Sequence, residues 1–417
     1  MWSTVLSERI PTQPLPPPRL ERDRVTVALY ASFTAWGWFL YSFSPAVPLI
    51  AAEQGISRAQ AGLHGTALAA GTLLSGFLTA YLNPRFGRRR VLLVGGSVLI
   101  AGLVGLMAGH TLAITLPATL VIGLGGTLII SAAQPALAMH HHEASSAAVT
   151  EANGVGALVG LVAPLALGAS VDLGLGWRPA VGITIGFALA MLALVTRLPR
   201  VAALDRSRAP GGGTVAARAG AGPGAATGFS PAFWFFLVSV LMAVAIENTT
   251  TYWATDLLRS ETGMSAGLAS AALTGLIGGM CAVRFAIGPI SLRVTPEVLL
   301  IASFAVAGIG WLIFWLASVP ALAMGGLVIA GLGYGVQYPL GMVLVLRASR
   351  GRPDAAQARA SLAAGAAIGL APFVLGALAD AVGTHSAFLL VPVLITAGGA
   401  SVAFGRRSGI RAGSAPA

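Results

Sequence analysis

The sequence predicts an all-α integral membrane protein in which twelve transmembrane helices form two pseudo-symmetric six-helix bundles. The composition supports this class, because 56% of the 417 residues are hydrophobic and only 9% are charged, whereas about 25% of a soluble domain is charged. The chain also resolves into a dozen apolar stretches of about 20 residues, and a helix of that length crosses a hydrocarbon core of about 30 Å. Finally, the second half of the chain repeats features of the first half.

The apolar stretches follow one another with short polar loops between them. We expect transmembrane helices at residues 25–52, 61–82, 91–109, 112–138, 148–173 and 179–197, and again at 232–257, 265–290, 298–317, 319–346, 357–380 and 385–405. These spans group into a first bundle at 25–197 and a second at 231–405. Residues 198–230 are rich in Gly, Ala, Pro and Arg without an apolar period, which predicts a flexible cytoplasmic linker. Residues 1–24 and 406–417 are predicted to be cytoplasmic tails, the first of them disordered.

The repeat is clearest in the fifth and eleventh spans. The segments APLALGASVD at 163–172 and APFVLGALAD at 371–380 share their Ala-Pro, Gly and Asp positions at a constant offset of 208 residues. A parallel repeat of half the chain length predicts two bundles related by an axis along the membrane normal. Pro164 and Pro372 are expected to bend their helices and allow the bundles to rock, with simple kinks as the alternative.

Arginine is concentrated in alternate loops, and the chain contains no lysine. The loops on one predicted side carry 21 arginines, and those on the other side carry 3. Positive residues mark cytoplasmic loops, so both termini of this multi-pass chain are expected in the cytoplasm. The Ala-, Gly- and Arg-rich composition is typical of a GC-rich bacterial genome, and we expect a bacterial cytoplasmic (inner) membrane. The net charge of +11 then predicts contact with the anionic lipid bilayer and not with nucleic acid.

The loop between the second and third spans carries a basic motif. It reads Asn83-Pro84-Arg85-Phe86-Gly87-Arg88-Arg89-Arg90, and it resembles the Asp-Arg-x-Gly-Arg-Arg signature of the major facilitator superfamily (MFS), with Pro84 in place of the Asp. Helix count, central linker and half-chain repeat extend the resemblance over nearly the whole chain. The resemblance implies an MFS fold, a monomer, and a gating role for Arg85, Gly87, Arg88 and Arg89, which in the family help to latch the outward-facing state.

An acidic side chain lies within the seventh span. Glu247 is about 15 residues from the predicted cytoplasmic end, or roughly 22 Å deep at the rise of an α-helix. Ionisable residues inside a membrane are costly and are functional by default, so Glu247 is a candidate proton carrier. The alternative is a shorter span that leaves this residue in an outer vestibule.

A basic side chain lies within the eighth span. Arg284 is about six residues from the predicted inner end, roughly 9 Å deep. It is a candidate ligand for a substrate carboxylate or phosphate, a partner for a carboxylate such as Glu151, or a side chain that reaches to the cytoplasmic surface. The difference in depth argues against a direct ion pair with Glu247.

Uncharged polar and aromatic side chains at mid-depth suggest a substrate cavity. In the family that this chain resembles, the first, fourth, seventh and tenth helices line the central path. The predicted substrate-binding residues are Trp36, Trp38, Tyr41, Gln134, Asn248, Tyr252, Tyr334, Gln337 and Tyr338, together with Arg284. For each of these residues, interhelical hydrogen bonding or a place at the membrane interface is the alternative to substrate contact.

Other polar residues are expected near the helix ends. Glu151 opens the fifth span and is a candidate inner gate, whereas Asp172, Asp256 and Asp380 fall at outer helix ends, where we expect water around them. Three histidines and a glutamate at 140–143 suggest a metal cluster. Consecutive histidines on a helix cannot all face one ion, however, and no second ligand group is visible, so we favour a solvated polar loop. We predict neither a metal site nor a cofactor.

The predicted function is secondary active transport of a small-molecule substrate by alternating access, coupled to protons. The substrate is either an amphipathic compound for export, which suits an aromatic cavity, or a small organic anion or metabolite, which Arg284 favours. A transport-inactive sensor or scaffold on the same fold is the alternative, and it would be expected to carry a large soluble domain. An enzyme is not expected, because the sequence offers no nucleophile with its base, metal-ligand set or cofactor loop.

Overall fold

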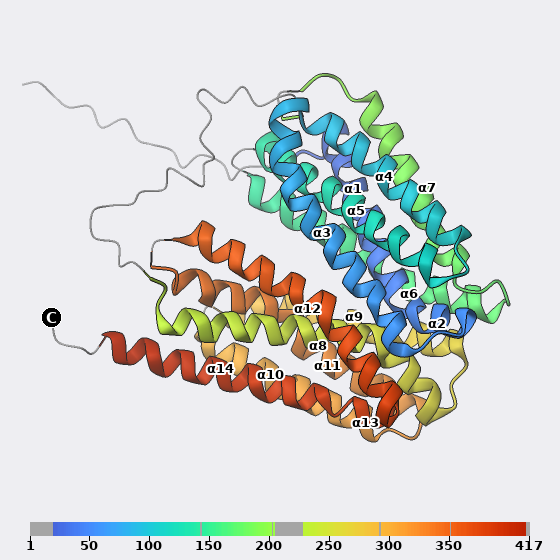
Figure 1. Ribbon diagram of the computed structural model, residues 1–417. Coiled ribbons are helices and arrows are strands. Elements are labelled where there is room, and N and C mark those ends of the chain that lie inside the picture. Colours follow the sequence, from blue (N-terminus) through green and yellow to red (C-terminus); the bar gives the residue numbers. More distant parts are fainter. Residues whose placement is uncertain are drawn as a thin grey trace, which may run out of the picture.

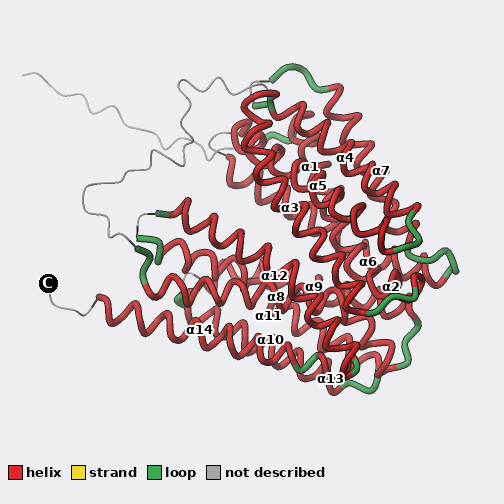
Figure 2. Tube along the Cα trace, in the orientation of Figure 1, coloured by secondary structure: helices red, strands yellow, loops and turns green. Residues whose placement is uncertain are grey.

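The computed structural model describes residues 20–141, 144–201, 203–204, 228–291, 293–350 and 352–413. These residues form helices and contain no strand (Figure 2). Twelve of the described helices have 20 residues or more: α1 (Arg24–Phe43), α3 (Arg58–Phe86), α4 (Arg88–Ala108), α5 (Leu112–His141), α6 (Ser145–Asp172), α7 (Arg178–Arg197), α8 (Pro231–Thr262), α9 (Ala266–Ser291), α10 (Pro296–Leu316), α11 (Pro320–Arg347), α12 (Pro353–Val382) and α14 (Leu390–Gly413).

The helices begin where the sequence supplies starting signals. Asp23 caps α1, and Ser57 caps α3 in a reciprocal capping box with Gln60, while five further long helices begin with a proline in the first turn. Proline is favoured there because its missing N–H would have no partner in the helix. Among the described helices, eleven spans are long and apolar enough to cross a membrane. The twelfth long helix, α1, carries more polar residues, and it packs against α5, α6 and α7.

The predicted span at 25–52 is wrong as one continuous helix. Helix α1 ends at Phe43, a 3-10 turn η1 follows at Ser44–Ala46, and a short helix α2 runs over Val47–Gln54. Pro45 and Pro48 explain the break, because each lacks the N–H that a continuous helix needs. The last predicted span is likewise split into a short α13 (Thr384–Ala387) and α14, and α14 continues to Gly413, into the predicted tail at 406–417. Most of the predicted linker and residues 1–19 lie outside the described residues.

The helices are arranged as two halves, α1 to α7 and α8 to α14 (Figure 1). We call the end where α1 begins and α14 ends the terminal end, and the opposite end, with α2 and α13, the far end. The halves meet at the far end and separate toward the terminal end in Figure 1. The main contacts between them join α3 to α12 and α6 to α9. These two pairs are equivalent under the half-chain repeat, as two related bundles require.

Glu53 links the short helix α2 to the loops before α5 and α7 of the same half. Its carboxylate accepts hydrogen bonds from the guanidinium of Arg178 at 2.6 and 2.7 Å and from the indole of Trp177 at 2.8 Å. His110 adds a contact at 3.2 Å. The Arg178 hydrogen bonds are the main reason that the pKa of Glu53 falls from 4.5 to about 2, against the opposing effect of partial burial.

We expect Glu53→Gln to lower the free energy of unfolding by about 1 to 2 kcal/mol at neutral pH, because a charged but partly exposed hydrogen-bonded contact is lost. A carboxylate with a depressed pKa stabilises the fold above its ordinary pKa of 4.5, and this contribution disappears as the pH falls toward about 2. The melting temperatures of parent and variant should therefore differ near neutral pH and converge in acid. A difference that stays constant down to the acid limit would contradict this origin.

Candidate functional site

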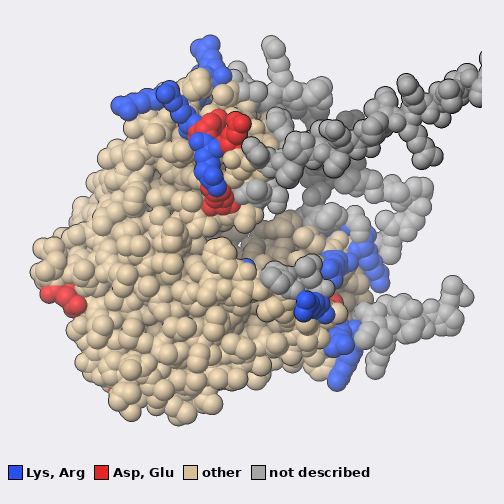
Figure 3. Space-filling model, turned by 180° about the vertical axis from the view of Figure 1, so that it is seen from behind, with Lys and Arg blue, Asp and Glu red and all other residues tan. Residues whose placement is uncertain are grey.

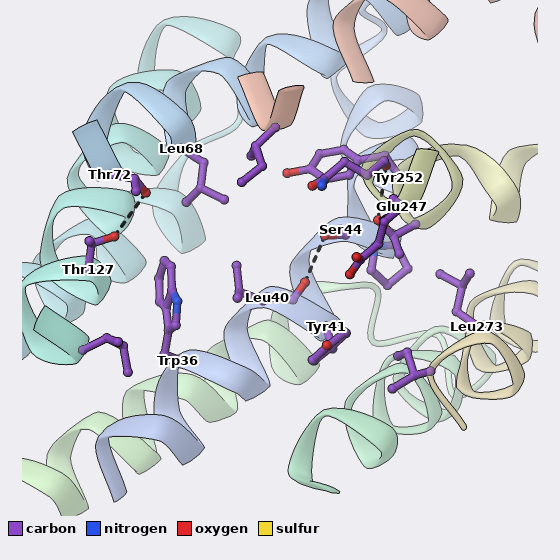
Figure 4. A pocket seen from close by; sticks show the side chains of 16 residues that line it. Trp36, Leu40, Tyr41, Ser44, Leu68, Thr72, Thr127, Glu247, Tyr252 and Leu273 are labelled. Atoms are coloured by element: carbon purple, nitrogen blue, oxygen red, sulfur yellow. Dashed lines mark hydrogen bonds between the residues drawn. The ribbon is translucent and has the colours of Figure 1, made fainter. Parts of the chain in front are cut away.

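A cavity of about 370 Å³ lies between the two halves. From the first half it is lined by α1, η1, α3 and α5, and from the second half by α8, α9 and α12 (Figure 4). The lining residues are Trp36, Leu40, Tyr41, Ser44, Pro45, Leu68, Thr72, Thr127, Ile130, Glu247, Asn248, Thr251, Tyr252, Leu273, Ile277 and Ile368. Most of this wall is aliphatic or aromatic, with hydroxyl and amide groups between, and it contains a single acidic side chain.

Two aromatic residues of α1 reach the cavity because glycines on neighbouring helices leave room for their rings. A Cβ atom at Gly126 of α5 would overlap the ring of Trp36, and a Cβ atom at Gly160 of α6 would overlap the ring of Tyr41. Each ring therefore occupies the space that a side chain at the glycine would need. Small residues at such positions let elements in a membrane protein approach closely.

We expect Gly126→Ala to displace Trp36 into the cavity, because the ring cannot stay where the new methyl group would be. Overpacking of this kind costs about 1–3 kcal/mol, and where a bound ligand must push the ring back against the new methyl group, the apparent KM would rise by about 5- to 150-fold. The measurement is the KM of the flux assay described under "Proposed function". Gly186→Ala on α7 is the matched control, since a Cβ atom there meets no other atom within 4 Å. Equal KM values for the two variants would contradict the placement of Trp36.

The second half contributes Glu247 from α8. Figure 4 shows its carboxylate pointing into the cavity, toward Ser44 and Tyr41. Among the described residues, no hydrogen bond or ion pair engages this carboxylate. Arg284 forms no ion pair with it among the residues that the structure describes. A carboxylate in this setting is free to bind a proton or a positively charged group.

Arg284 lies outside the main cavity lining. Its Nε donates to the carbonyl of Gly335 at 2.8 Å, and it borders a second hollow with Tyr338 and neighbouring apolar residues. The suggested partnership of Arg284 with Glu151 is wrong, because Glu151 accepts both hydrogen bonds of Arg22 at 2.6 and 2.8 Å. Both of these side chains belong to the first half.

The predicted substrate-binding residues are divided between the cavity and other places. Trp36, Tyr41, Asn248 and Tyr252 line it. Trp38 instead donates from its indole to the carbonyl of Ala180 at 2.8 Å and ties α1 to α7. Tyr334 is buried, with its hydroxyl 3.1 Å from that of Thr250. Gln337 is buried, and neither of its amide atoms has a hydrogen-bond partner among the described residues. Gln134 is exposed away from the lining, and Tyr338 borders the second hollow.

Sequence reasoning missed several residues of the cavity wall. Ser44, Thr72, Thr127 and Thr251 supply hydroxyl groups, and Thr127 donates to Thr72 at 3.1 Å. Serine and threonine in helices usually bond to their own backbone, so their positions carry no sequence signal for a cavity. The break at Pro45, visible as two prolines in an apolar run, is the signal that could have placed η1 here.

The basic motif makes contacts within the first half. Gly87 has a positive φ of 81°, which only glycine adopts without strain, and it turns the chain from α3 into α4. Arg88 donates to the carbonyl of Ala203 at 3.2 Å, and Arg89 donates to that of Thr196 at 2.7 Å. Arg85 lies over the ring of Tyr81. The motif therefore holds the end of α7 and the residues just after it, at the end where the halves have separated.

At the far end, contacts made by three carboxylates join the two halves. Asp380 of α12 accepts the backbone N–H groups of Arg58 and Ala59 at 2.9 and 2.7 Å, at the start of α3. Arg58 also pairs with Asp256 of α8 at 2.7 Å. On the other side, Asp172 of α6 accepts the hydroxyl of Ser265 at 3.2 Å, just before α9. The expectation that these three aspartates are only hydrated is wrong.

The helices can approach this closely because a glycine lies four residues, about one helical turn, before Asp172 and before Asp380. A Cβ atom at Gly168 would lie 2.6 Å from the carbonyl oxygen of Gly267, and one at Gly376 would lie 2.5 Å from that of Arg58. Both distances are shorter than real side chains tolerate. We refer to the contacts of Asp172 and Asp380 as the far-end caps.

Comparison with known proteins identifies the fold. The family model of the Major Facilitator Superfamily matches residues 27–255 and 235–415. A search of curated protein sequences finds no match. Among solved structures, a bacterial homologue of the human lysosomal transporter Spinster, inward-facing and occupied, is similar with a TM-score of 0.76 at 16% identity, covering 96% of this chain and 100% of that one.

Two further transporters resemble the chain. The nucleoside transporter NupG is similar with a TM-score of 0.73 at 11% identity, covering 92% of this chain and 98% of its own. The E. coli fucose:proton symporter FucP gives 0.59 at 16% identity, with 91% and 98% covered. At these identities the similarity establishes the fold, and the match of the family model extends over nearly the whole sequence. The chain therefore belongs to the Major Facilitator Superfamily and is a transporter, not an enzyme.

Proposed function

We propose that the protein is a proton-coupled secondary transporter that moves an amphipathic small molecule by alternating access. The observation that carries this proposal is the cavity between the halves, whose mostly apolar and aromatic wall contains one acidic side chain, Glu247. The halves are joined beyond the cavity at the far end and apart at the terminal end. A central site that is open toward one side at a time is the basis of alternating access.

The arginines support a direction of access. They gather at the terminal end, while the middle of the molecule presents a broad uncharged surface (Figure 3). Positively charged segments stay on the cytoplasmic side of bacterial membranes. We therefore assign the terminal end and both termini to the cytoplasm, and the present conformation to an inward-open state of a monomer in the cytoplasmic membrane.

Glu247 supports coupling to protons. A charged carboxylate is tolerated while the cavity is open to water, but it is costly when both ends close around it. Protonation, or pairing with a cationic substrate, removes this cost and lets the halves change conformation. A proton and a cationic substrate would then compete for one carboxylate, as exchange of the two requires. The fucose:proton symporter among the similar structures supports proton coupling on this fold.

The lining favours an amphipathic substrate with a positive or hydrogen-bond-donating group. Trp36, Tyr41 and Tyr252 offer aromatic surface, and Glu247 offers the negative charge. The cavity is expected to bind a small anion less tightly, because Arg284 lies outside the lining and its Nε donates to a backbone carbonyl. The anionic alternative therefore has no positively charged group in the main cavity.

The test is flux in proteoliposomes with an imposed pH gradient. The panel should pair amphipathic amines and neutral amphipaths with small organic anions of similar size, and protein-free liposomes serve as the control. We expect flux of the amines that stops when a protonophore dissipates the gradient. Flux of the anions alone would contradict the substrate class, and flux that is indifferent to the gradient would contradict proton coupling.

A further inference from the structure

A group of metal-ligating side chains lies at the terminal end of the first half, outside the transport cavity. Asp23 precedes α1 and caps it, accepting the backbone N–H of Thr26 at 2.8 Å. His140 and His141 are the last two residues of α5. The Nε2 atom of His140 lies 2.8 Å from Oδ2 of Asp23, and Nε2 of His141 lies 2.7 Å from the hydroxyl of Thr26.

These side chains converge although the two histidines are adjacent in sequence. Consecutive residues of an α-helix point about 100° apart, so two neighbouring rings normally face different ways. Here the rings stand edge to face with centroids 5.0 Å apart. One ligand atom from each of Asp23, His140 and His141 lies within 4.8 Å of the other two. The interpretation of this run as a solvated loop is thus wrong for its first two residues; His142 and Glu143 lie outside the described residues.

The geometry points to a binding site for a divalent transition-metal ion such as Zn²⁺, formed by Asp23, His140 and His141. Two imidazole nitrogens and a carboxylate oxygen are a donor set that zinc prefers, at about 2.0–2.2 Å. At these bond lengths, ligand atoms around a tetrahedral ion lie about 3.4 Å apart. Small side-chain rotations would bring the three ligand atoms from their present positions to this spacing. Water would complete the coordination. Ca²⁺ and Mg²⁺ prefer oxygen ligands and fit poorly.

The position of the site defines what an ion would do there. The side chains of His140 and Asp23 are 23% and 43% exposed, so an ion reaches them directly from water. The neighbouring Arg22 directs its guanidinium to Glu151 instead of Asp23. Because the ligands come from the start of α1 and the end of α5, a bound ion would clamp these two helices together beside the cavity opening.

The first test is titration of the purified full-length protein, free of any histidine tag, with ZnCl₂ by calorimetry. We expect one saturable site per chain. Asp23→Asn keeps a helix-capping side chain but loses the charged ligand, and His141→Ala removes an imidazole. Each variant should bind Zn²⁺ at least about tenfold more weakly. His110→Ala, at the far end, is the matched control and should leave the affinity unchanged.

A second measurement separates loss of the site from loss of the fold. ZnCl₂ should raise the melting temperature of the parent and of His110→Ala, but not that of Asp23→Asn, while the metal-free proteins melt alike. The proposal is overturned if Zn²⁺ fails to bind saturably to the parent. It is also overturned if Asp23→Asn and His141→Ala, melting like the parent without metal, bind Zn²⁺ as tightly as the parent does.

Discussion

Replacing Glu247 with glutamine should abolish substrate accumulation driven by a pH gradient, while substrate exchange without a gradient persists with a weaker substrate affinity. Glutamine has the size of the protonated carboxyl group and similar hydrogen-bonding capacity, but it cannot release a proton. Among the residues that the structure describes, Glu247 is the one acidic side chain in the cavity lining, so no other carboxylate of that lining can take over its role. Accumulation should therefore fall to the passive equilibrium level, measured as gradient-driven uptake and as counterflow in the same proteoliposomes.

The matched control is Glu297→Gln. Glu297 lies in the first turn of α10, away from the cavity, and its loss should leave both measurements unchanged. Continued accumulation by Glu247→Gln would move the coupling site elsewhere. Loss of counterflow together with accumulation, in a protein that melts normally, would contradict the expectation that the aromatic wall still binds the substrate when residue 247 can no longer pair with it.

Removing both far-end caps with Asp172→Ala and Asp380→Ala should open the far end in a large share of molecules. A capping carboxylate at a helix N-terminus is worth about 1 kcal/mol. Loss of two such contacts shifts the balance between closed and open far ends by about 2 kcal/mol, or about 30-fold. The caps contact helices of the opposite half, so they are absent when the far end is open.

The measurement is the distance between spin labels on the two halves at the far end. Leu175 and Val319 are exposed there and would carry the labels as cysteines, after the single native Cys281 is replaced by serine. The double variant should show a second, longer distance. Glu261→Ala is the control, because the contacts of Glu261 stay within the second half. An unchanged distance distribution in the double variant would show that the caps do not control the opening.

The two caps lie at equivalent places of the repeat, although Asp380 accepts backbone N–H groups and Asp172 accepts a hydroxyl. Asp172 and Asp380 are separated by the 208 residues of the repeat, and so are Ser57 and Ser265, whose hydroxyls accept N–H groups at the starts of α3 and α9. The repeat itself could be recognised in the sequence. The residues that Asp172 and Asp380 contact could not be recognised, because each aspartate contacts the half of the molecule that does not contain it.

Helix positions could be predicted from the sequence because they follow from local properties. Apolar length, caps and prolines fix where a helix begins and ends, and the predicted spans agree with the observed helices except at η1, before α14 and at the end of α14. The direction in which a side chain faces is a different matter. Trp36 and Trp38 lie at nearly the same depth, yet residues two apart point about 200° apart on a helix. One therefore lines the cavity and the other binds α7.

The site residues also depend on contacts between distant parts of the chain. Asp23 meets His140 across 117 residues, and Arg22 meets Glu151 across 129. A sequence read one segment at a time gives the depth of each charged residue but not its partner. For this reason Glu247 could be singled out from its depth, whereas the ligands beside His140 and the far-end partners could not.

The break after α1 has an electrostatic effect on the cavity. In a continuous helix, the carbonyl of Tyr41 would accept the N–H of residue 45, but that residue is Pro45 and has none. Both residues line the cavity. The carbonyl of Tyr41 therefore lacks its usual helical donor at a turn that borders the cavity, and its partial charge has the same sign as the carboxylate of Glu247. A proton can neutralise the carboxylate, whereas the backbone dipole does not titrate.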